Sequence, residues 1–174
     1  MDKIRLSKNK KTRRVDIFIN GKSLINILRK VEISQIEKDN EKERNNKKDS
    51  EYKYIKQYLS PETMEKLTKR NNEKTPKSLA GSYTGLPPKR VFLPSKHFLG
   101  KQSKRWYYRN NKTCILVCSC GGAGCWPMIT KITLTPKKVI WNNFEQAHNS
   151  RWKYNLKFNF DRKQYESELS KRNA

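Results

Sequence analysis

The feature that most constrains this chain is a tight cluster of cysteines. Cys118, Cys120 and Cys125 fall within eight residues, and three glycines lie between the second and the third. Glycine adopts backbone conformations closed to other residues, so this stretch is expected to turn sharply and bring the sulfur atoms together. A tetrahedral zinc ion, with Zn–S distances of about 2.3 Å, places its sulfurs about 3.8 Å apart. The spacing therefore predicts a structural zinc site on a turn that follows a strand.

A fourth ligand has to come from elsewhere in the sequence. Cys114 lies about 13 Å from Cys118 if the residues between them are extended at about 3.3 Å each, so it is expected in the core. The chain has two histidines, His97 and His148. His148 is favoured because it follows the hairpin that leaves the cysteine turn, whereas His97 lies in an irregular loop. Water as the fourth ligand, reduced thiols without a metal, and a redox or nucleophilic role stay open as alternatives.

Alternation of apolar and polar residues predicts an antiparallel sheet built from hairpins. Turn signals such as Asn20-Gly21 separate the segments, and the Asp161 region has the spacing of a helix cap. The predicted fold class is α+β, a single small domain with a few short helices. The predicted elements are strands at 15–19, 105–109, 113–118, 128–134, 139–141 and 156–160, and helices at 23–32 and after residue 161.

Charge divides the chain into a folded part and two additions. Residues 1–14 carry seven basic residues and one acidic residue, which predicts a basic tail. Residues 37–76 mix charges with asparagine, which is typical of a solvated helix or a disordered insertion, and Ser60 offers a further helix start. Residues 15–36 and 77–174 are then expected to form one α+β domain.

The block from residue 75 to residue 144 has twelve lysines and arginines and no aspartate or glutamate. A folded module without carboxylates projects a positive field, which attracts nucleic acid or an acidic protein. Within the block, aromatic residues lie among cations, as on surfaces that stack on bases and pair with phosphates. The competing interpretation is a strand whose rings fill the core, in a chain rich in lysine and asparagine. The predicted nucleic-acid contacts are Lys101, Lys104, Arg105, Trp106, Tyr108, Arg109 and Lys112.

Wider motifs surround the cysteines. They read Cys118-x-Cys120-Gly121-x-x-Gly124-Cys125-Trp126-Pro127, Trp141-x-x-Phe144-x-Gln146-x-His148, Trp152-x-Tyr154 and Phe158-x-Phe160-Asp161-Arg162-x-Gln164-Tyr165-Glu166. This pattern resembles a widespread, functionally uncharacterised bacterial family, which has proline and arginine where this chain has Ala147 and Asn149. The resemblance implies that the cysteines, Trp126, His148 and the C-terminal aromatic residues form one constellation. The cysteine spacing is also similar to the post-SET zinc site of lysine methyltransferases.

The sequence gives little support to other classes of function. A hydrophobic leader and an apolar run of membrane-spanning length are both missing, so a cytoplasmic protein is expected. Motifs of zinc proteases, P-loop proteins, α/β-hydrolases, dinucleotide enzymes and zinc deaminases are absent. The sequence favours a small protein that a structural zinc ion stabilises and that binds nucleic acid or another polyanion. The alternatives are an immunity-like or antitoxin-like factor that binds an acidic protein, and a zinc- or thiol-dependent enzyme.

Overall fold

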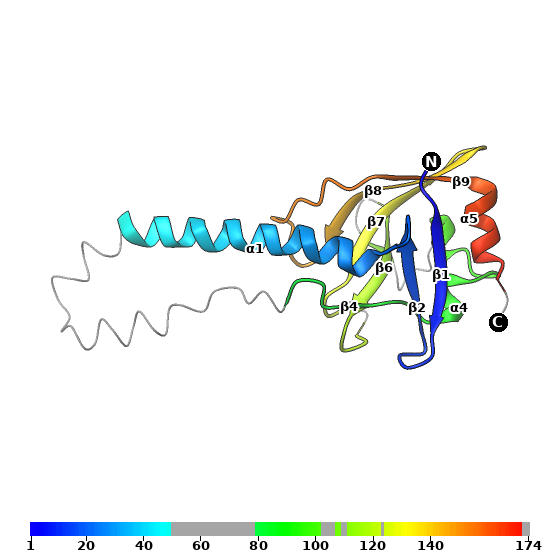
Figure 1. Cartoon of the computed structure of the whole chain (residues 1–174), viewed down its shortest axis with the longest axis horizontal. Coiled ribbons are helices and arrows are strands. Elements are labelled where there is room, and N and C mark those ends of the chain that lie inside the picture. Colours follow the sequence, from blue (N-terminus) through cyan, green and yellow to red (C-terminus); the bar gives the residue numbers. More distant parts are fainter. Residues whose placement is uncertain (50–78, 102–106, 109–110, 123, 172–174) are drawn as a thin grey trace.

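Two antiparallel sheets and a few helices make up the fold, which confirms the predicted α+β class (Figure 1). The structure, a computed structural model, describes residues 1–49, 79–101, 107–108, 111–122 and 124–171. The first sheet has the order β1-β2-β3, and the second has the order β4-β6-β7-β8-β9 with β5 paired to β6. The strands are β1 (Ile4–Asn9), β2 (Arg14–Ile19), β3 (Lys22–Ser23), β4 (Tyr83–Thr84), β5 (Tyr107–Tyr108), β6 (Lys112–Cys118), β7 (Met128–Leu134), β8 (Lys138–Gln146) and β9 (Phe158–Asp161). The helices are α1 (Leu24–Asp49), α4 (Pro88–Val91), α5 (Arg162–Leu169) and the 3-10 turn η2 (His97–Leu99).

The N-terminal segment is a strand, and the prediction of a basic tail over residues 1–14 was wrong. β1 pairs with β2 in register along its whole length. Ile4 and Leu6 are buried while Arg5 between them is exposed, so the strand covers one face of the core and keeps its cations in solvent. Ile4 and Leu6, set among seven cations, are too weak a local pattern to reveal a strand whose partner lies further along the chain.

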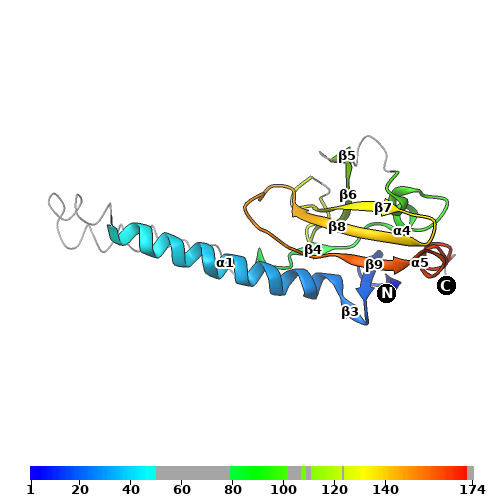
Figure 2. The same ribbon diagram turned by 90° about the horizontal axis from the view of Figure 1, so that it is seen from above.

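α1 extends well past the helix predicted over residues 23–32. Residues 37–49, the first part of the predicted insertion, belong to it. Its side chains are buried against the domain as far as Ile36, and the helix then projects away from the sheets (Figure 1 and Figure 2). The rest of the insertion, including the helix expected after Ser60, lies outside the described residues. Within the described part of the chain, no helix is both long and apolar enough to cross a membrane.

The two sheets are joined at two places, which encloses the core between them. At one place Asp2 forms a parallel bridge with Phe160 of β9. At the other, the backbone N–H of Val15 donates to the carbonyl of Leu86, at 3.0 Å. The backbones approach so closely there that a Cβ on Gly85 would lie 1.9 Å from the Val15 carbonyl oxygen. Glycine is therefore required at this junction.

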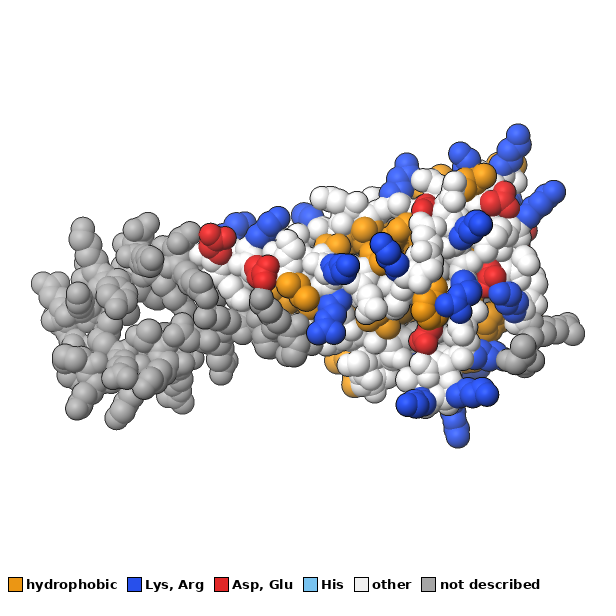
Figure 3. Space-filling model, in the orientation of Figure 1, with side chains coloured by type: hydrophobic (Ala, Val, Ile, Leu, Met, Phe, Trp, Pro, Cys, Tyr) orange, Lys and Arg blue, Asp and Glu red, His pale blue; other side chains and the backbone are white. Residues whose placement is uncertain are grey.

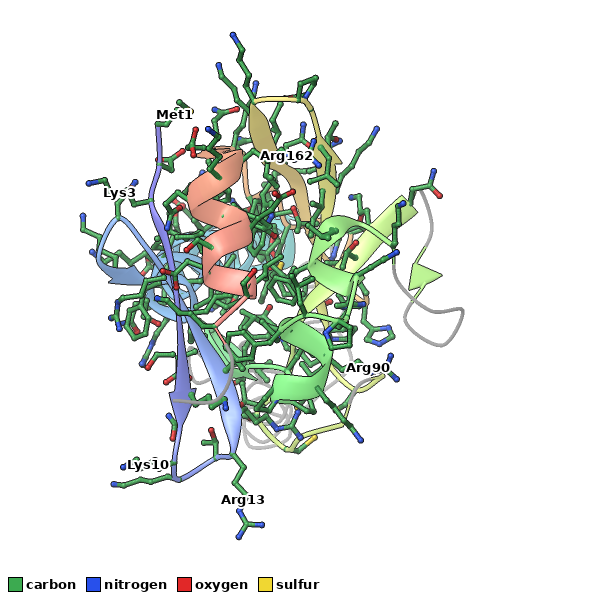
Figure 4. The ribbon with its side chains drawn as sticks, turned by 90° about the vertical axis from the view of Figure 1, so that its right-hand side faces the viewer. Met1, Lys3, Lys10, Arg13, Arg90 and Arg162 are labelled. Carbon is green, nitrogen blue, oxygen red and sulfur yellow. The ribbon has the colours of Figure 1, made fainter. Side chains whose placement is uncertain are left out.

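α5 covers the edge of β1 with side-chain hydrogen bonds (Figure 4). The Gln164 amide accepts from the backbone N–H of Ile4 at 3.3 Å and donates to its carbonyl at 2.6 Å, as a neighbouring strand would. Glu168 accepts from the N–H of Leu6 at 2.9 Å. Asp161 caps the helix by accepting from the Gln164 N–H at 2.9 Å, which confirms the predicted cap. These contacts occupy groups that an open strand edge would offer to other chains.

The second sheet contains the predicted hairpins and carries most of the aromatic core. β7 and β8 pair along both predicted strands, and β8 continues to Gln146. Trp141 is fully buried and makes edge-to-face contacts with Phe98, Phe160 and Tyr165, at centroid distances of 5.6, 5.6 and 6.1 Å. Its indole N–H donates to the Tyr165 hydroxyl at 3.1 Å, so the one polar group of this side chain is satisfied.

Candidate metal centre

The cysteine cluster lies on the loop that joins β6 to β7. Cys118 is the last residue of β6 and lies opposite Tyr83 of β4. The N–H of Gly121 donates to the Cys118 carbonyl at 2.8 Å, and Gly121 has a φ of 88°, which glycine adopts without strain. A second turn follows, in which the N–H of Cys125 donates to the Gly122 carbonyl at 3.4 Å. The glycines thus fold the loop back on itself.

The loop brings together the three predicted sulfur ligands. The sulfur atoms of Cys118, Cys120 and Cys125 all lie within 4.8 Å of one another, close to the roughly 3.8 Å that tetrahedral zinc requires. Cys118 is half-buried and the other two are exposed. The N–H of Gly122 donates to the Cys120 sulfur at 3.4 Å, and a Cβ on Gly122 would also lie 3.4 Å from that sulfur. The three cysteines can therefore hold a metal ion.

Three of the thiols, Cys114, Cys118 and Cys125, have shifted pKa values. A hydrogen bond from the backbone N–H of Cys120, and a second from its thiol, lower the pKa of Cys118. Hydrogen bonds to the thiols of Cys118 and Cys120 raise the pKa of Cys125 to about 11. Cys114 is fully buried outside the cluster, as predicted, and burial raises its pKa to about 12. A metal therefore displaces a proton more readily from Cys118 than from Cys125.

His148 is the histidine that contacts the cysteine loop. Its Nε2 lies 2.7 Å from the carbonyl oxygen of Gly124, and its backbone N–H donates to the Gln146 side chain at 2.6 Å. The ring nitrogens do not belong to the group of ligand atoms within 4.8 Å, so a bond to a metal requires the side chain to move. His97 is buried with its Nε2 2.7 Å from the Cys114 carbonyl, and burial lowers its pKa. This core position gives His97 a structural role.

A buried carboxylate is connected to the cysteine loop through β4. Glu32 of α1 is fully buried and accepts hydrogen bonds from the Gly81 N–H at 2.6 Å and from the hydroxyls of Tyr83 and Tyr154 at 2.5 and 2.7 Å. Burial raises the pKa of Glu32, and the three hydrogen bonds oppose that shift. Because Tyr83 also pairs with Cys118, the network links α1 to the strand that carries the cluster.

Two residues of this region were not found by sequence reasoning. Glu32 falls between Leu28 and Ile36 on the apolar face of α1, where an acid is unusual, so the sequence did carry a usable signal. Arg14 donates from its guanidinium to the Gly121 carbonyl at 3.4 Å and so links the loop to the first sheet. No local pattern indicates that role, because 107 positions separate the two residues.

The predicted nucleic-acid surface is described only in part. Lys101 is exposed, and Tyr108 lies in β5 opposite Lys112. Lys112 is 8% exposed and its ammonium group forms an ion pair with Glu145 at 2.5 Å. This lysine was expected to face solvent, and in the structure it does not. A carboxylate just outside the acid-free block neutralises it. Four predicted contacts lie outside the described residues: Lys104, Arg105, Trp106 and Arg109.

Cations cover much of the described surface. In Figure 3, lysine and arginine side chains are spread over the domain and clearly outnumber the acidic ones on that face. Figure 4 shows Lys3, Lys10 and Arg13 projecting outward from the fold. Lys10 and Arg13 belong to the turn between β1 and β2, so the segment predicted as a basic tail contributes its charges from a fixed hairpin.

Comparisons with known proteins add no identification. No protein-family model matches the chain, and searches of curated proteins and of solved structures find no match either.

Proposed function

We propose that this chain is a zinc-binding protein whose metal fixes the cysteine loop and whose basic surface engages nucleic acid. Cys118, Cys120 and Cys125 supply three ligands, and His148 supplies the fourth. The observation that carries the proposal is the convergence of three sulfur atoms on a glycine-rich turn that a histidine contacts. Thiolate and imidazole donors together favour zinc among the common divalent metals, and four protein ligands make a closed, structural site.

The motif pattern supports the same grouping. The bacterial family that the chain resembles joins the cysteines, Trp126 and His148 in one pattern, and we propose membership of that family on those residues. Zinc in this position ties β6 to the end of β8. It stabilises a loop that in its absence is held mainly by turn hydrogen bonds and by Arg14.

Elemental analysis of the chain purified without a His-tag tests the metal site. We expect one zinc ion per chain, close to none after Cys120→Ser, and weaker retention after His148→Ala. A ligand present at about 100 times its Kd contributes about 2.7 kcal/mol, so Cys120→Ser should lower the melting temperature by roughly 5–10 °C. Cys114→Ala is the matched control, because this thiol lies outside the cluster, and it should keep its zinc. Zinc content unchanged by Cys120→Ser would contradict the assignment.

Salt dependence tests the basic surface. A single-stranded oligonucleotide should bind at about 50 mM salt, with log K falling by about 0.7 for each phosphate contacted per unit of log salt. Replacing Lys10, Lys11 and Arg13 by alanine should reduce that slope by roughly 2 if each contacts one phosphate. Thr12→Ala on the same turn changes no charge and should leave the slope unaltered. If the chain binds no oligonucleotide at low salt, the nucleic-acid proposal is wrong, and the proposal of a zinc site is unaffected.

A further inference from the structure

β8 and the segment that follows it separate and leave a cleft between them. The ladder between β8 and β9 stops at Trp141, and a bridge between Gln146 and Asn149 closes the other end. Figure 2 shows the segment bowing away from β8 before it returns to β9. The cleft has a volume of about 750 Å³, within the range of about 300–1,000 Å³ typical of ligand sites.

A left-handed asparagine shapes each wall of the cleft. Asn143, in the bulge of β8, has a φ of 52°, and Asn155, on the opposite wall, has a φ of 49°. Left-handed residues other than glycine are uncommon, and strained backbone gathers at ligand sites and active sites. The bends at these two residues leave neither wall as an extended edge, so the cleft presents side chains to a ligand and no ladder to a further strand.

Hydrogen bonds fix both walls in place. On one side the indole N–H of Trp152 donates to Asp39 of α1 at 3.1 Å, and the hydroxyl of Tyr154 donates to Glu32 of α1 at 2.7 Å. On the β8 side the hydroxyl of Thr130 donates to a backbone carbonyl of the bulge at 2.7 Å. The cleft is therefore formed before any ligand binds, which reduces the cost of ordering it.

The lining of the cleft carries a net positive charge. It includes three lysines and one glutamate, a net charge of +2, and the ion pair between Lys112 and Glu145 leaves the ammonium groups of Lys153 and Lys157. Both of these lysines are exposed, and within the described part of the chain neither pairs with a carboxylate. Lys153 donates one hydrogen to the carbonyl of Ser150 at 3.2 Å, which leaves two for a ligand. The cleft therefore favours an anion.

Hydrogen-bonding and apolar groups complete the lining. The carboxamides of Asn143 and Asn155 are exposed, and no described residue makes a hydrogen bond with either of them. A carboxamide donates and accepts at once, so it can pair with the edge of a nucleic-acid base. Mostly buried apolar side chains give a planar ring a surface to pack against, and they are Phe144, Trp152, Tyr154 and Leu156.

We propose that this cleft binds one nucleotide of a single-stranded nucleic acid, an inference that rests on the nucleic-acid function proposed above. The phosphate pairs with Lys153 and Lys157, the base edge bonds to the carboxamides of Asn143 and Asn155, and the base packs on the apolar lining. A nucleotide carries all three kinds of group, whereas inorganic phosphate lacks the ring and an acidic peptide lacks the base. A single strand is the favoured source because its bases are free to leave the stack and expose their edges.

Calorimetric titration of the full chain with nucleoside 5′-monophosphates at about 50 mM salt tests the site directly. We expect a monophosphate to bind about tenfold more tightly than its nucleoside or than inorganic phosphate, because each of these lacks one set of contacts. Lys153→Ala/Lys157→Ala should weaken that binding about tenfold. Lys22→Ala/Lys163→Ala removes the same charge from exposed positions outside the cleft and should leave it unchanged. All four lysines are exposed, so circular dichroism should show both variants folded.

Asn143→Gly/Asn155→Gly tests the contacts to the base. Glycine adopts positive φ values without strain, so the walls keep their course while both carboxamides are removed. We expect monophosphates to bind about threefold to tenfold more weakly and to differ less from one base to another. Inorganic phosphate, which contacts the lysines alone, should bind as it does to wild type. Unchanged affinity and base preference in this variant would overturn the assignment of the base to the cleft.

A single-stranded oligonucleotide separates this inference from the function on which it rests. We expect the strand to bind more tightly than a monophosphate and to lose affinity in Lys153→Ala/Lys157→Ala. Strand binding that this variant leaves intact would overturn the cleft proposal while nucleic-acid binding stands. Monophosphate binding without strand binding would overturn the nucleic-acid function and assign the cleft to free nucleotides. Equal competition by polyglutamate would show that the cleft recognises charge alone, which also overturns the proposal.

Discussion

Glu32→Ala is expected to lower the free energy of unfolding by about 3–5 kcal/mol. The substitution leaves three buried donors without an acceptor, at about 1–3 kcal/mol each where they cannot find new partners, and it opens a cavity. The donors are the Gly81 N–H and the hydroxyls of Tyr83 and Tyr154, from three separate parts of the chain. Urea or thermal denaturation would measure the loss, which corresponds to a fall in melting temperature of roughly 10 °C.

Glu32→Gln is the matched control, since it keeps the shape and removes the charge. Its amide oxygen can accept from Gly81, while its NH₂ donates to tyrosine oxygens that rotate their own hydrogens away. We expect a change within about 1 kcal/mol at pH 5, the scale of one hydrogen bond. If Glu32→Ala were as stable as Glu32→Gln, the network would not have the role that its burial and hydrogen bonds indicate.

The same pair of proteins has a pH signature with a defined sign. The folded-state pKa of Glu32 is raised above its ordinary value of 4.5, so the folded chain holds this proton more tightly than the unfolded chain does. The contribution of Glu32 to stability is therefore greatest below pH 4.5 and declines as pH rises through the folded pKa. Relative to wild type, Glu32→Gln should gain stability as pH rises above 4.5 through the folded pKa of Glu32, and a difference independent of pH would contradict this assignment.

The second large effect is expected at Gly85. Gly85→Ala places a Cβ 1.9 Å from the carbonyl oxygen of Val15, a contact with backbone that no side-chain rotation relieves. Either β2 moves away and loses the hydrogen bond from Val15 to Leu86, or the chain around residue 85 is displaced. Overpacking of this kind costs about 1–3 kcal/mol and more where backbone has to move, so we expect a loss of at least about 3 kcal/mol.

Gly124→Ala is the control for that experiment. A Cβ at Gly124 meets no atom within 4 Å, and its carbonyl, which contacts His148, is unchanged by the substitution. The free energy of unfolding should stay within about 0.5 kcal/mol of wild type. Equal effects of the two substitutions in chemical denaturation would show that the junction between the sheets at Gly85 is not under the steric constraint described.

The parts of the fold that could be predicted are those whose partners are close in sequence. The β7–β8 hairpin and the cap at Asp161 depend on residues a few positions apart, and both are present. β1 was missed because it has only two apolar positions, Ile4 and Leu6, in a cation-rich segment, and their alternation is recognisable as a strand only opposite β2. α1 was cut short because the apolar period fades after Ile36, although the lysines, arginines and glutamates that follow are good helix formers.

In the candidate site, too, the features that depend on nearby residues could be predicted and those that depend on distant residues could not. The convergence of Cys118, Cys120 and Cys125 is a local consequence of glycine turns and could be predicted from spacing. The contact of His148 with the loop depends on where β8 ends, and the sequence favoured this histidine without fixing its geometry. The link from Arg14 to the loop crosses between the sheets, so no periodicity within either segment encodes it.

The hydrogen bonds that cover the edge of β1 also set an order of events during synthesis. The hydrogen-bond partner of Ile4, Gln164, is synthesised 160 positions later, and the partner of Leu6, Glu168, is synthesised 162 positions later. At about 5–20 residues per second a ribosome needs roughly 10–30 s to make that interval. During that time the nascent strand has to be kept from pairing with neighbouring chains, and the positive charge of the first fourteen residues repels identical copies.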